Sequence, residues 1–299
     1  MVNWFPIALL TAFSSATADA VIKARFSDLE PTGMVVVKAA APVPFLILPL
    51  FLMPWPGLCL DFWRILAFLL PLEIFGLFLY MEVLKTSPIS LSVPFLAFTP
   101  VFMVLTGWFI LGERIDIRGS AGILCAAAGA YLLHLKAYKQ GVLEPFHAII
   151  KDKGSRLMLL VSAVYAISGV LGKRAVQESG PFFFACFYFV TLGLITFLVF
   201  YLIPRLFGRD FGVTGPRSSS RAIQWPAFWA VGLAQSVMVI SHMWAIHLVA
   251  AAYMIAVKRT SILFSVLYGR LLFSEDETMK RLAGAGLMAF GAALIMINW

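Results

Sequence analysis

The chain has 299 residues, of which 61% are hydrophobic and 13% charged, and its mean hydropathy is +0.92. A soluble domain carries roughly a quarter charged residues, so this composition excludes an ordinary water-soluble fold. The formal net charge is +8, but the basic residues lie in short connections between apolar segments, which favours membrane topology over nucleic-acid binding. The sequence lacks the polar–apolar alternation of a membrane β-barrel, so we expect an all-α integral membrane protein.

Apolar segments long enough to span a bilayer recur along the whole chain, and a spanning helix needs about 20 such residues. The first, from Trp4 to Ala24, has no basic region before it and contains Asp19, which favours a retained helix over a cleaved signal peptide. Pro88, Pro94 and Pro100 fall within the fourth and predict kinks. We predict ten transmembrane helices, at 4–24, 33–53, 65–84, 88–111, 118–135, 157–175, 181–203, 226–247, 250–272 and 281–298.

The two halves of the sequence repeat each other. A shift of 162 residues pairs Glu113 with Glu275, Gly122 with Gly284, Gly129 with Gly291, Glu73 with Gln235 and Tyr80 with His242, and a shift of 150 pairs Lys23 with Lys173 in the first helix of each half. Five spans per half is an odd number, so the second half should be inverted relative to the first, as in many transporters. We therefore expect a first five-helix repeat at 1–138, a connecting loop at 139–156 and a second repeat at 157–299.

The segment Leu111-Gly112-Glu113, followed by a Gly-rich helix at 121–130 and by partners around Glu275, resembles the drug/metabolite transporter superfamily in its EamA-like ten-helix branch. Ser274 departs from the glycine that usually precedes the second glutamate. The resemblance implies a transporter fold. It specifies the substrate poorly, because relatives handle amino acids, sugars, nucleotide sugars and drugs. For Glu113 and Glu275 themselves we expect loop positioning or capping of the next helix, because carboxylates favour helix N-termini.

Two adjacent cations, Lys258 and Arg259, lie deep within the predicted ninth span. Helical rise puts them roughly 12 to 14 Å from its start, near the middle of a hydrocarbon core about 30 Å thick. Charges at this depth usually have a partner or a task, and two cations here favour an anionic ligand. The pair also resembles the plastid sugar-phosphate translocators, where a matching pair holds the anionic group. Since neighbouring residues point about 100° apart, we expect at most one to point straight at a cavity.

An internal ion pair is the alternative, with Glu73 of the third span as the partner of Lys258 or Arg259, because the predicted depths match. Glu73 and Tyr80 are seven residues apart and share a helix face, as do Gln235 and His242 in the eighth span. For His242 we expect packing or hydrogen bonding ahead of proton transfer. All six side chains are candidates for contact with a solute.

Asp19 and Lys38 share a depth in the first and second spans, which predicts an ion pair between them. A position for Lys38 at the mouth of a cavity is the alternative, and we include it among the candidate solute-binding residues. Cys59, Cys125 and Cys186 have no metal-ligand spacing, and we expect neither disulfides, a metal site nor a cofactor.

The orientation in the membrane is open. Basic residues concentrate in the loops after odd-numbered spans, which by the positive-inside rule would place those loops in the cytoplasm and both termini outside. The family resemblance implies the opposite arrangement, with both termini in the cytoplasm.

The leading hypothesis is a secondary transporter that moves a small anionic or zwitterionic metabolite by alternating access, because no GxxxxGK[ST] motif is present to couple ATP. A proton, through Glu73 or His242, or a counter-substrate would supply direction. The expected partners are a small solute and a lipid bilayer, in a bacterial inner membrane. The alternatives are an exporter of cationic or apolar drug-like compounds and a non-transporting scaffold or receptor. An enzyme is not expected, because no nucleophile with its base and no metal cluster is found.

Overall fold

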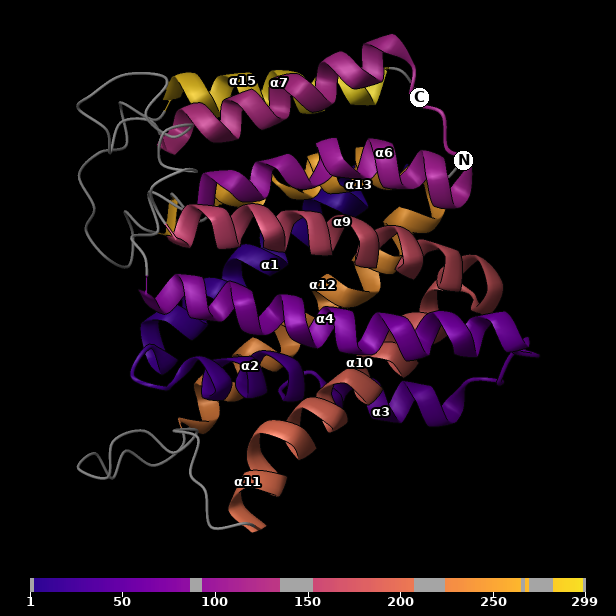
Figure 1. The fold of residues 1–299 in the computed structure, drawn as a ribbon, viewed down its shortest axis with the longest axis vertical. Coiled ribbons are helices and arrows are strands. Elements are labelled where there is room, and N and C mark those ends of the chain that lie inside the picture. Colours follow the sequence, from indigo (N-terminus) through magenta and orange to yellow (C-terminus); the bar gives the residue numbers. More distant parts are fainter. Residues whose placement is uncertain are drawn as a thin grey trace.

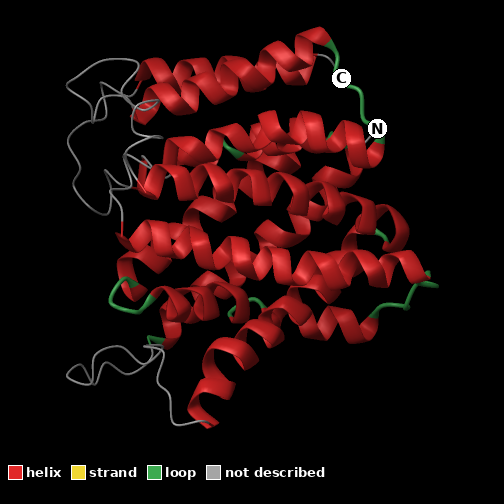
Figure 2. Cartoon of the chain, viewed as in Figure 1, coloured by secondary structure: helices red, strands yellow, loops and turns green. Residues whose placement is uncertain are grey.

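The computed structural model describes residues 3–86, 93–134, 153–206, 224–264, 267–268 and 282–297. Over these residues the chain is helical and has no strand (Figure 2). Pro88, Ser274 and Glu275 lie outside the described residues, as does most of the predicted connecting loop at 139–156.

The first half contains α1 (Trp4–Phe26), α2 (Pro31–Ala40), α3 (Val43–Leu52), α4 (Leu60–Thr86), the 3-10 helix η1 (Val93–Phe98), α6 (Thr99–Leu111) and α7 (Ile117–His134). The second half contains α9 (Lys153–Ser179), α10 (Pro181–Phe197), the π-helix η3 (Leu198–Leu202), α11 (Ile203–Leu206), α12 (Trp225–Leu248), α13 (Ala251–Lys258) and α15 (Leu282–Ile297).

Six helical segments among the described residues are long and apolar enough to cross a membrane. They coincide with the predicted first, second, third, sixth, seventh and eighth spans, whereas the other four predicted spans correspond to shorter or interrupted helices. Large apolar side chains such as Phe51, Phe68 and Phe109 are exposed on these helices, as expected for side chains that face lipid. The protein is therefore a helical, multi-pass integral membrane protein.

Three of the predicted spans are interrupted among the described residues. The second has a turn at Ala41 and Pro42 between α2 and α3. The fourth, from residue 93 on, is a 3-10 helix that contains Pro94 and continues as α6, in which Pro100 takes the second position. The ninth, which we expected to be continuous, ends as α13 at Lys258 and turns at Arg259 and Thr260 before helix resumes at 261–264. The Thr260 hydroxyl donates to the Val257 carbonyl at 2.7 Å, a side-chain bond that competes with regular helix.

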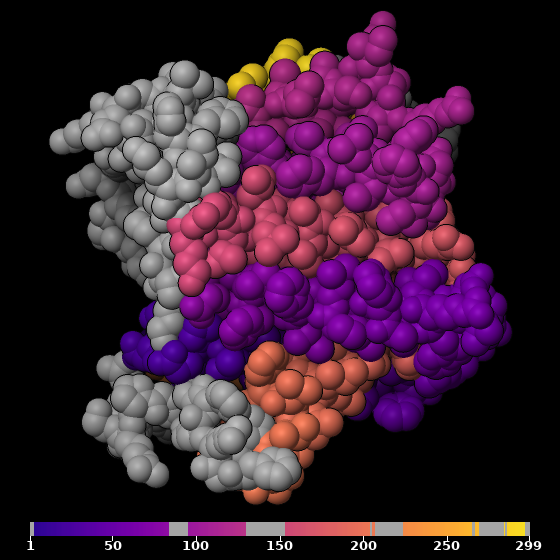
Figure 3. Space-filling model, viewed as in Figure 1, coloured from indigo at the N-terminus to yellow at the C-terminus, as the bar shows by residue number. Residues whose placement is uncertain are grey.

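Three long helix pairs organise the bundle: α1 packs along α12, α4 along α9 and α7 along α15 (Figure 1). On the face shown in Figure 3, side chains of α4 and α9 lie against each other along their length. The sequence repeat relates α1 to α9 and α12 to α4, so the first pair is the counterpart of the second. Both ends of the chain are marked at the same end of the bundle (Figure 1).

The α7–α15 pair is antiparallel and packs through glycine. A Cβ on Gly122 would lie 3.0 Å from the Gly291 carbonyl oxygen, and one on Gly129 would lie 2.7 Å from the Gly284 carbonyl oxygen. These four positions are the ones that the sequence repeat pairs. Gly122 contacts the repeat counterpart of Gly129, and Gly129 contacts the repeat counterpart of Gly122. The contact is therefore reciprocal, as for two elements related by a twofold axis.

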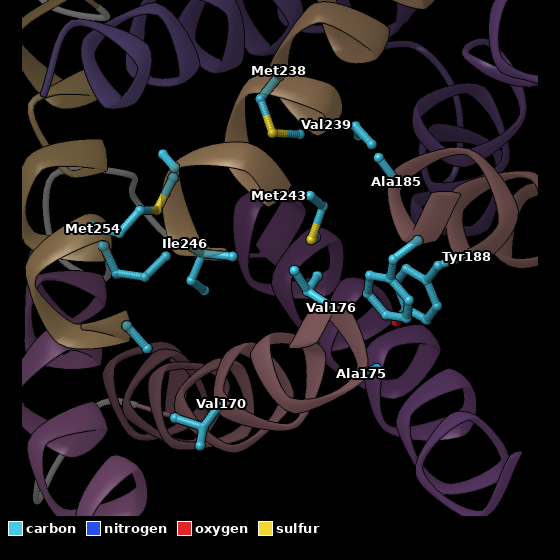
Figure 4. Close-up of a cluster of buried hydrophobic side chains, with 14 of the residues drawn as sticks. Val170, Ala175, Val176, Ala185, Tyr188, Met238, Val239, Met243, Ile246 and Met254 are labelled. Carbon is cyan, nitrogen blue, oxygen red and sulfur yellow. The ribbon is translucent and has the colours of Figure 1, made fainter. Parts of the chain in front are cut away.

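The main buried apolar cluster contains residues of α4, α9, α10, α12 and α13 among others. Figure 4 shows Val176 of α9 and Ala185 of α10 with Met238, Val239 and Met243 of α12, all of them buried. This packing holds the three helices together on one side of the site described next.

Candidate functional site

A cavity of about 180 Å³ lies within the bundle, bordered by α1, α2, α4, η1, α6, α9, α10, α12 and α13. All of the side chains that the sequence predicted for solute binding line it. They are Lys38, Glu73, Tyr80, Gln235, His242, Lys258 and Arg259. The structure thus brings these residues together, and their role in binding stays a prediction.

Lys258 and Arg259, hereafter the cation pair, both border the cavity. That at most one of them points straight at it stays a prediction. Both are long side chains at the end of α13, where the cavity reaches the last turn of the helix. The Lys258 Nζ lies 2.9 Å from His242 Nδ1, and an Arg259 terminal nitrogen donates to the Thr99 hydroxyl at 2.7 Å. The Arg259 Nε is buried and has no hydrogen-bond partner.

Glu73 does not form the predicted ion pair. It lines the cavity with Ser168 beside its carboxyl group, but no ion pair among the described residues joins it to Lys258 or Arg259. Equal depth in the membrane therefore brought these groups into one cavity without bringing them into contact. The cation pair has no carboxylate partner within the part of the chain that the structure describes.

The predicted ion pair between Lys38 and Asp19 is confirmed, with Nζ 2.6 Å from the nearer carboxylate oxygen. Lys38 also lies over the Tyr80 ring, 5.5 Å from its centroid, and borders the cavity, so both predicted roles apply to its position. A glycine lets the helix α10 approach this end of α2 closely. A Cβ on Gly193 of α10 would meet the Ala39 carbonyl oxygen at 2.5 Å.

Sequence reasoning missed several cavity residues: Thr99, Tyr165, Ser168 and Tyr188. Tyr188 is 3% exposed, and its hydroxyl has no hydrogen-bond partner, as is also true of the Gln235 carbonyl oxygen. The repeat could have found Tyr188. Pro31 and Pro181 begin α2 and α10, and the 150-residue shift that pairs these prolines also pairs Lys38 with Tyr188.

A second group of residues with buried charge lies away from the cavity. We call it the Lys173 cluster, and it consists of Glu113, Lys173, Val249 and Ala251. The Lys173 Nζ donates to the Glu113 carboxylate and, at 2.6 Å, to the Val249 carbonyl. The other Glu113 oxygen accepts from the Ala251 amide at 3.1 Å. Glu113 therefore caps the first turn of α13 and attaches the loop in which it lies to that helix. Of its two predicted roles, these contacts agree with loop positioning and not with capping of the helix that follows it in sequence.

Asp116 caps that following helix instead. It accepts from the Gly119 amide of α7 at 3.1 Å and from the Tyr253 hydroxyl of α13 at 2.5 Å. Asp116 lies in the connection between α6 and α7, and the hydrogen bond that it accepts from Tyr253 lowers the pKa of its carboxyl group. Together, Glu113 and Asp116 attach this connection to α13.

The cysteines form no disulfide: Cys59 is exposed, Cys125 is partly buried and Cys186 is buried. Within the described ranges, no three His, Cys, Asp or Glu side chains are grouped to hold a metal ion. The side chains that line the cavity offer hydrogen bonding, charge and apolar contact.

The EamA-like transporter family matches this sequence over residues 3–135 and 152–297. A crystal structure described only as that of a protein has a similar fold, with a TM-score of 0.66 over 99% of this chain and 96% of that chain at 16% sequence identity. Among curated proteins, none matches the chain significantly.

Proposed function

Because the chain belongs to the EamA-like transporter family, we propose that it is a secondary transporter of a small anionic or zwitterionic solute. The observation that carries this substrate class is the cation pair. Lys258 and Arg259 border the cavity, no ion pair among the described residues includes either, and the Arg259 Nε lacks a partner. A buried cation without a counter-ion is costly, and an anionic solute would remove that cost.

The formal charges around the cavity support an anion. Lys38, Lys258 and Arg259 contribute three positive charges, and Asp19 and Glu73 contribute two negative ones, which leaves one positive charge when His242 is neutral. The volume of about 180 Å³ is below the roughly 300 to 1,000 Å³ of drug-sized pockets. A metabolite of few heavy atoms fits this site better than a bulky drug-like compound.

The proposed architecture is two inverted five-helix repeats, ten transmembrane helices in all, divided at 1–138, 139–156 and 157–299. The antiparallel, reciprocal contact of α7 with α15 supports it, because an in-plane twofold axis produces that contact. The matching pairs α1–α12 and α9–α4 support it as well. An even number of crossings agrees with chain ends at one end of the bundle (Figure 1).

The interruptions of the fourth and ninth spans support alternating access. Helix breaks near the midplane are a recurring feature of transporter binding sites. Here the break before α6 and the break after α13 meet, because Arg259 donates to Thr99 at 2.7 Å. A solute at this junction would contact both halves of the repeat, so its binding would favour their closure around it.

For the coupling of transport we propose a proton or a counter-substrate, in a bacterial inner membrane. Lys258 and His242 lie 2.9 Å apart, so the two nitrogens share one proton favourably and repel each other with two. An anion beside this pair would favour the second proton, which couples solute and proton binding through charge alone.

A thermal-shift screen of the purified protein tests the substrate class, since a ligand of the folded state raises its apparent stability. The screen uses phosphorylated, carboxylated, zwitterionic and cationic metabolites. We expect anions or zwitterions to raise the melting temperature in the wild type and to lose that effect in Arg259→Gln. Stabilisation by cationic or apolar compounds alone would instead favour an exporter of drug-like solutes, and stabilisation by none would favour a scaffold or receptor.

A further inference from the structure

Three buried polar atoms around the cavity lack a hydrogen-bond partner: Tyr188 Oη, Gln235 Oε1 and Arg259 Nε. Tyr188 is 3% exposed and Gln235 is 5% exposed, and all three residues line the cavity. Most buried polar groups in proteins are hydrogen-bonded, so unsatisfied ones on a cavity wall indicate a group that binds there. Arg259 serves the anion of the proposed function, which leaves the other two atoms without an explanation.

Tyr188 and Gln235 reach the cavity from other helices than the cation pair does. They lie on α10 and α12, which pack against each other, whereas the cation pair lies on α13. The Tyr188 ring is held in place because it stacks on Phe184 at a centroid distance of 5.0 Å and meets Phe189 edge-on at 5.1 Å. Its hydroxyl is therefore presented from a fixed ring.

The chemistry of the two atoms specifies what they bind. The Gln235 carbonyl oxygen only accepts hydrogen bonds, whereas a tyrosine hydroxyl both donates and accepts. Nearby polar side chains do not serve them, since Ser236 donates to the Gly232 carbonyl at 2.7 Å and Ser168 lies beside Glu73. A hydroxyl or ammonium group would satisfy both atoms, whereas a methyl group would leave both unsatisfied.

We propose that Tyr188 and Gln235 form a second polar subsite, which binds a hydroxyl or ammonium group of the solute whose anionic group lies at Lys258 and Arg259. This inference rests on the proposed function and narrows it. The solute class is a small acid that carries a hydroxyl or amino substituent, and unsubstituted carboxylates and phosphates are poor ligands. Glu73, an electrostatic neighbour of Tyr188, would favour the ammonium group over the hydroxyl.

Isothermal titration calorimetry with matched ligands tests the subsite. One series is propionate, lactate and alanine, and the other is propyl phosphate and glycerol 3-phosphate. In the wild type we expect the hydroxyl- or amino-bearing ligand of a series to bind about tenfold tighter than its unsubstituted analogue, which corresponds to one good hydrogen bond. A larger gain for alanine than for lactate would assign the ammonium group, and the reverse would assign the hydroxyl.

Two substitutions remove the subsite without changing its bulk. In Tyr188→Phe and Gln235→Leu the preference should fall to within about twofold, while the unsubstituted analogue binds as in the wild type. Tyr201→Phe is the control, because Tyr201 lies outside the cavity and accepts from Arg205. It should retain the full preference.

Either of two results would overturn the inference: equal affinities within both series in the wild type, as for atoms that are simply hydrated, or a preference that survives both substitutions. Arg259→Gln separates this failure from failure of the proposed function. If Arg259→Gln binds every ligand as the wild type does, the anion site is wrong even where the Tyr188 dependence holds. If no ligand of either series binds the wild type, both proposals fail.

Discussion

The Lys173 cluster and the cation pair are two groups of buried charge with opposite degrees of satisfaction. Lys173 is 6% exposed and has two partners, the Glu113 carboxylate and the Val249 carbonyl, and Glu113 also accepts from the Ala251 amide. Each residue of the cation pair has one hydrogen-bond neighbour, His242 or Thr99, and the pair retains an Nε without a partner among the described residues. One α-helix connects the two, because α13 begins at Ala251 and ends at Lys258.

The difference shows how to separate structural from functional charge in a membrane protein. A buried charge whose hydrogen-bonding capacity is filled by the protein contributes to stability, and removing one partner leaves the other exposed to the full cost of burial. A buried charge that the protein leaves partly unsatisfied contributes little to stability and is available to a ligand. Each of the following predictions tests one side of this comparison.

The largest effect is expected for Lys173→Met, which leaves the Glu113 carboxylate buried without its cation. We expect the free energy of unfolding to fall by about 3 to 5 kcal/mol, the usual cost of breaking a buried pair, in denaturant unfolding of the purified protein. Arg64→Met is the matched control, because Arg64 pairs with Asp61 at 3.1 Å on the exposed surface. It should change stability by less than about 1 kcal/mol. Equal effects of the two substitutions would contradict the structural role of the Lys173 cluster.

Arg259→Gln should have the opposite profile. Without its cation the protein should keep or raise its free energy of unfolding, because no ion pair is broken and a costly buried charge is removed. Anionic ligands should bind more weakly by about 2 to 5 kcal/mol, the usual effect of truncating one partner of a charged contact. Stability and affinity are both measured on the same preparation. A large loss of stability with unchanged affinity would show that the cation pair is structural.

Gly119→Ala tests the second attachment of α13. A Cβ at this position would lie 1.8 Å from the Tyr253 hydroxyl, so Tyr253 has to move away from Asp116. We expect a loss of about 1 to 3 kcal/mol in thermal unfolding, as for other overpacked sites. Gly286→Ala in α15 is the control, since nothing lies within 4 Å of its Cβ position, and alanine there should be neutral or stabilising. A neutral Gly119→Ala would show that the Tyr253–Asp116 contact is dispensable.

The smallest effect concerns pH. The hydrogen bond from Tyr253 lowers the pKa of Asp116 from its ordinary 3.8, so the ionised carboxylate stabilises the folded state at neutral pH. That contribution is full above the unfolded-state pKa and is lost as pH falls through the lower folded-state value. The melting temperature of Tyr253→Phe should therefore lie below that of the wild type at neutral pH and approach it below about pH 4. A difference that stays constant well below pH 4 would contradict this linkage.

Much of the fold could be predicted from the sequence because membrane insertion depends on a one-dimensional property, the length of an apolar run. Depth along a helix is nearly as direct, and it correctly paired Asp19 with Lys38. The glycines of the repeat also had a physical meaning, since Gly122 and Gly129 are required for the close approach of α7 and α15.

Depth does not specify rotation or lateral position, which is where prediction stopped. Glu73 and Lys258 reach the same cavity but not each other, and Lys258 contacts His242 instead. Glu113 was expected to position its loop or to cap the next helix, and it positions the loop by capping α13, which lies more than a hundred residues along the chain. The helix α13 is followed by a turn at Arg259 and Thr260 that contains no proline or glycine, so no helix-breaking residue predicted this break.

Uptake into proteoliposomes tests the central claim most directly, that an anionic solute crosses the membrane through the cavity at Lys258 and Arg259. The wild type, Lys258→Gln, Arg259→Gln and the surface control Arg64→Met are reconstituted without ATP and given an anion that stabilises the purified protein. We predict that the wild type and Arg64→Met accumulate the anion down its gradient, and that the two cavity variants do so at least about tenfold more slowly. Unimpaired uptake by both cavity variants would contradict the claim.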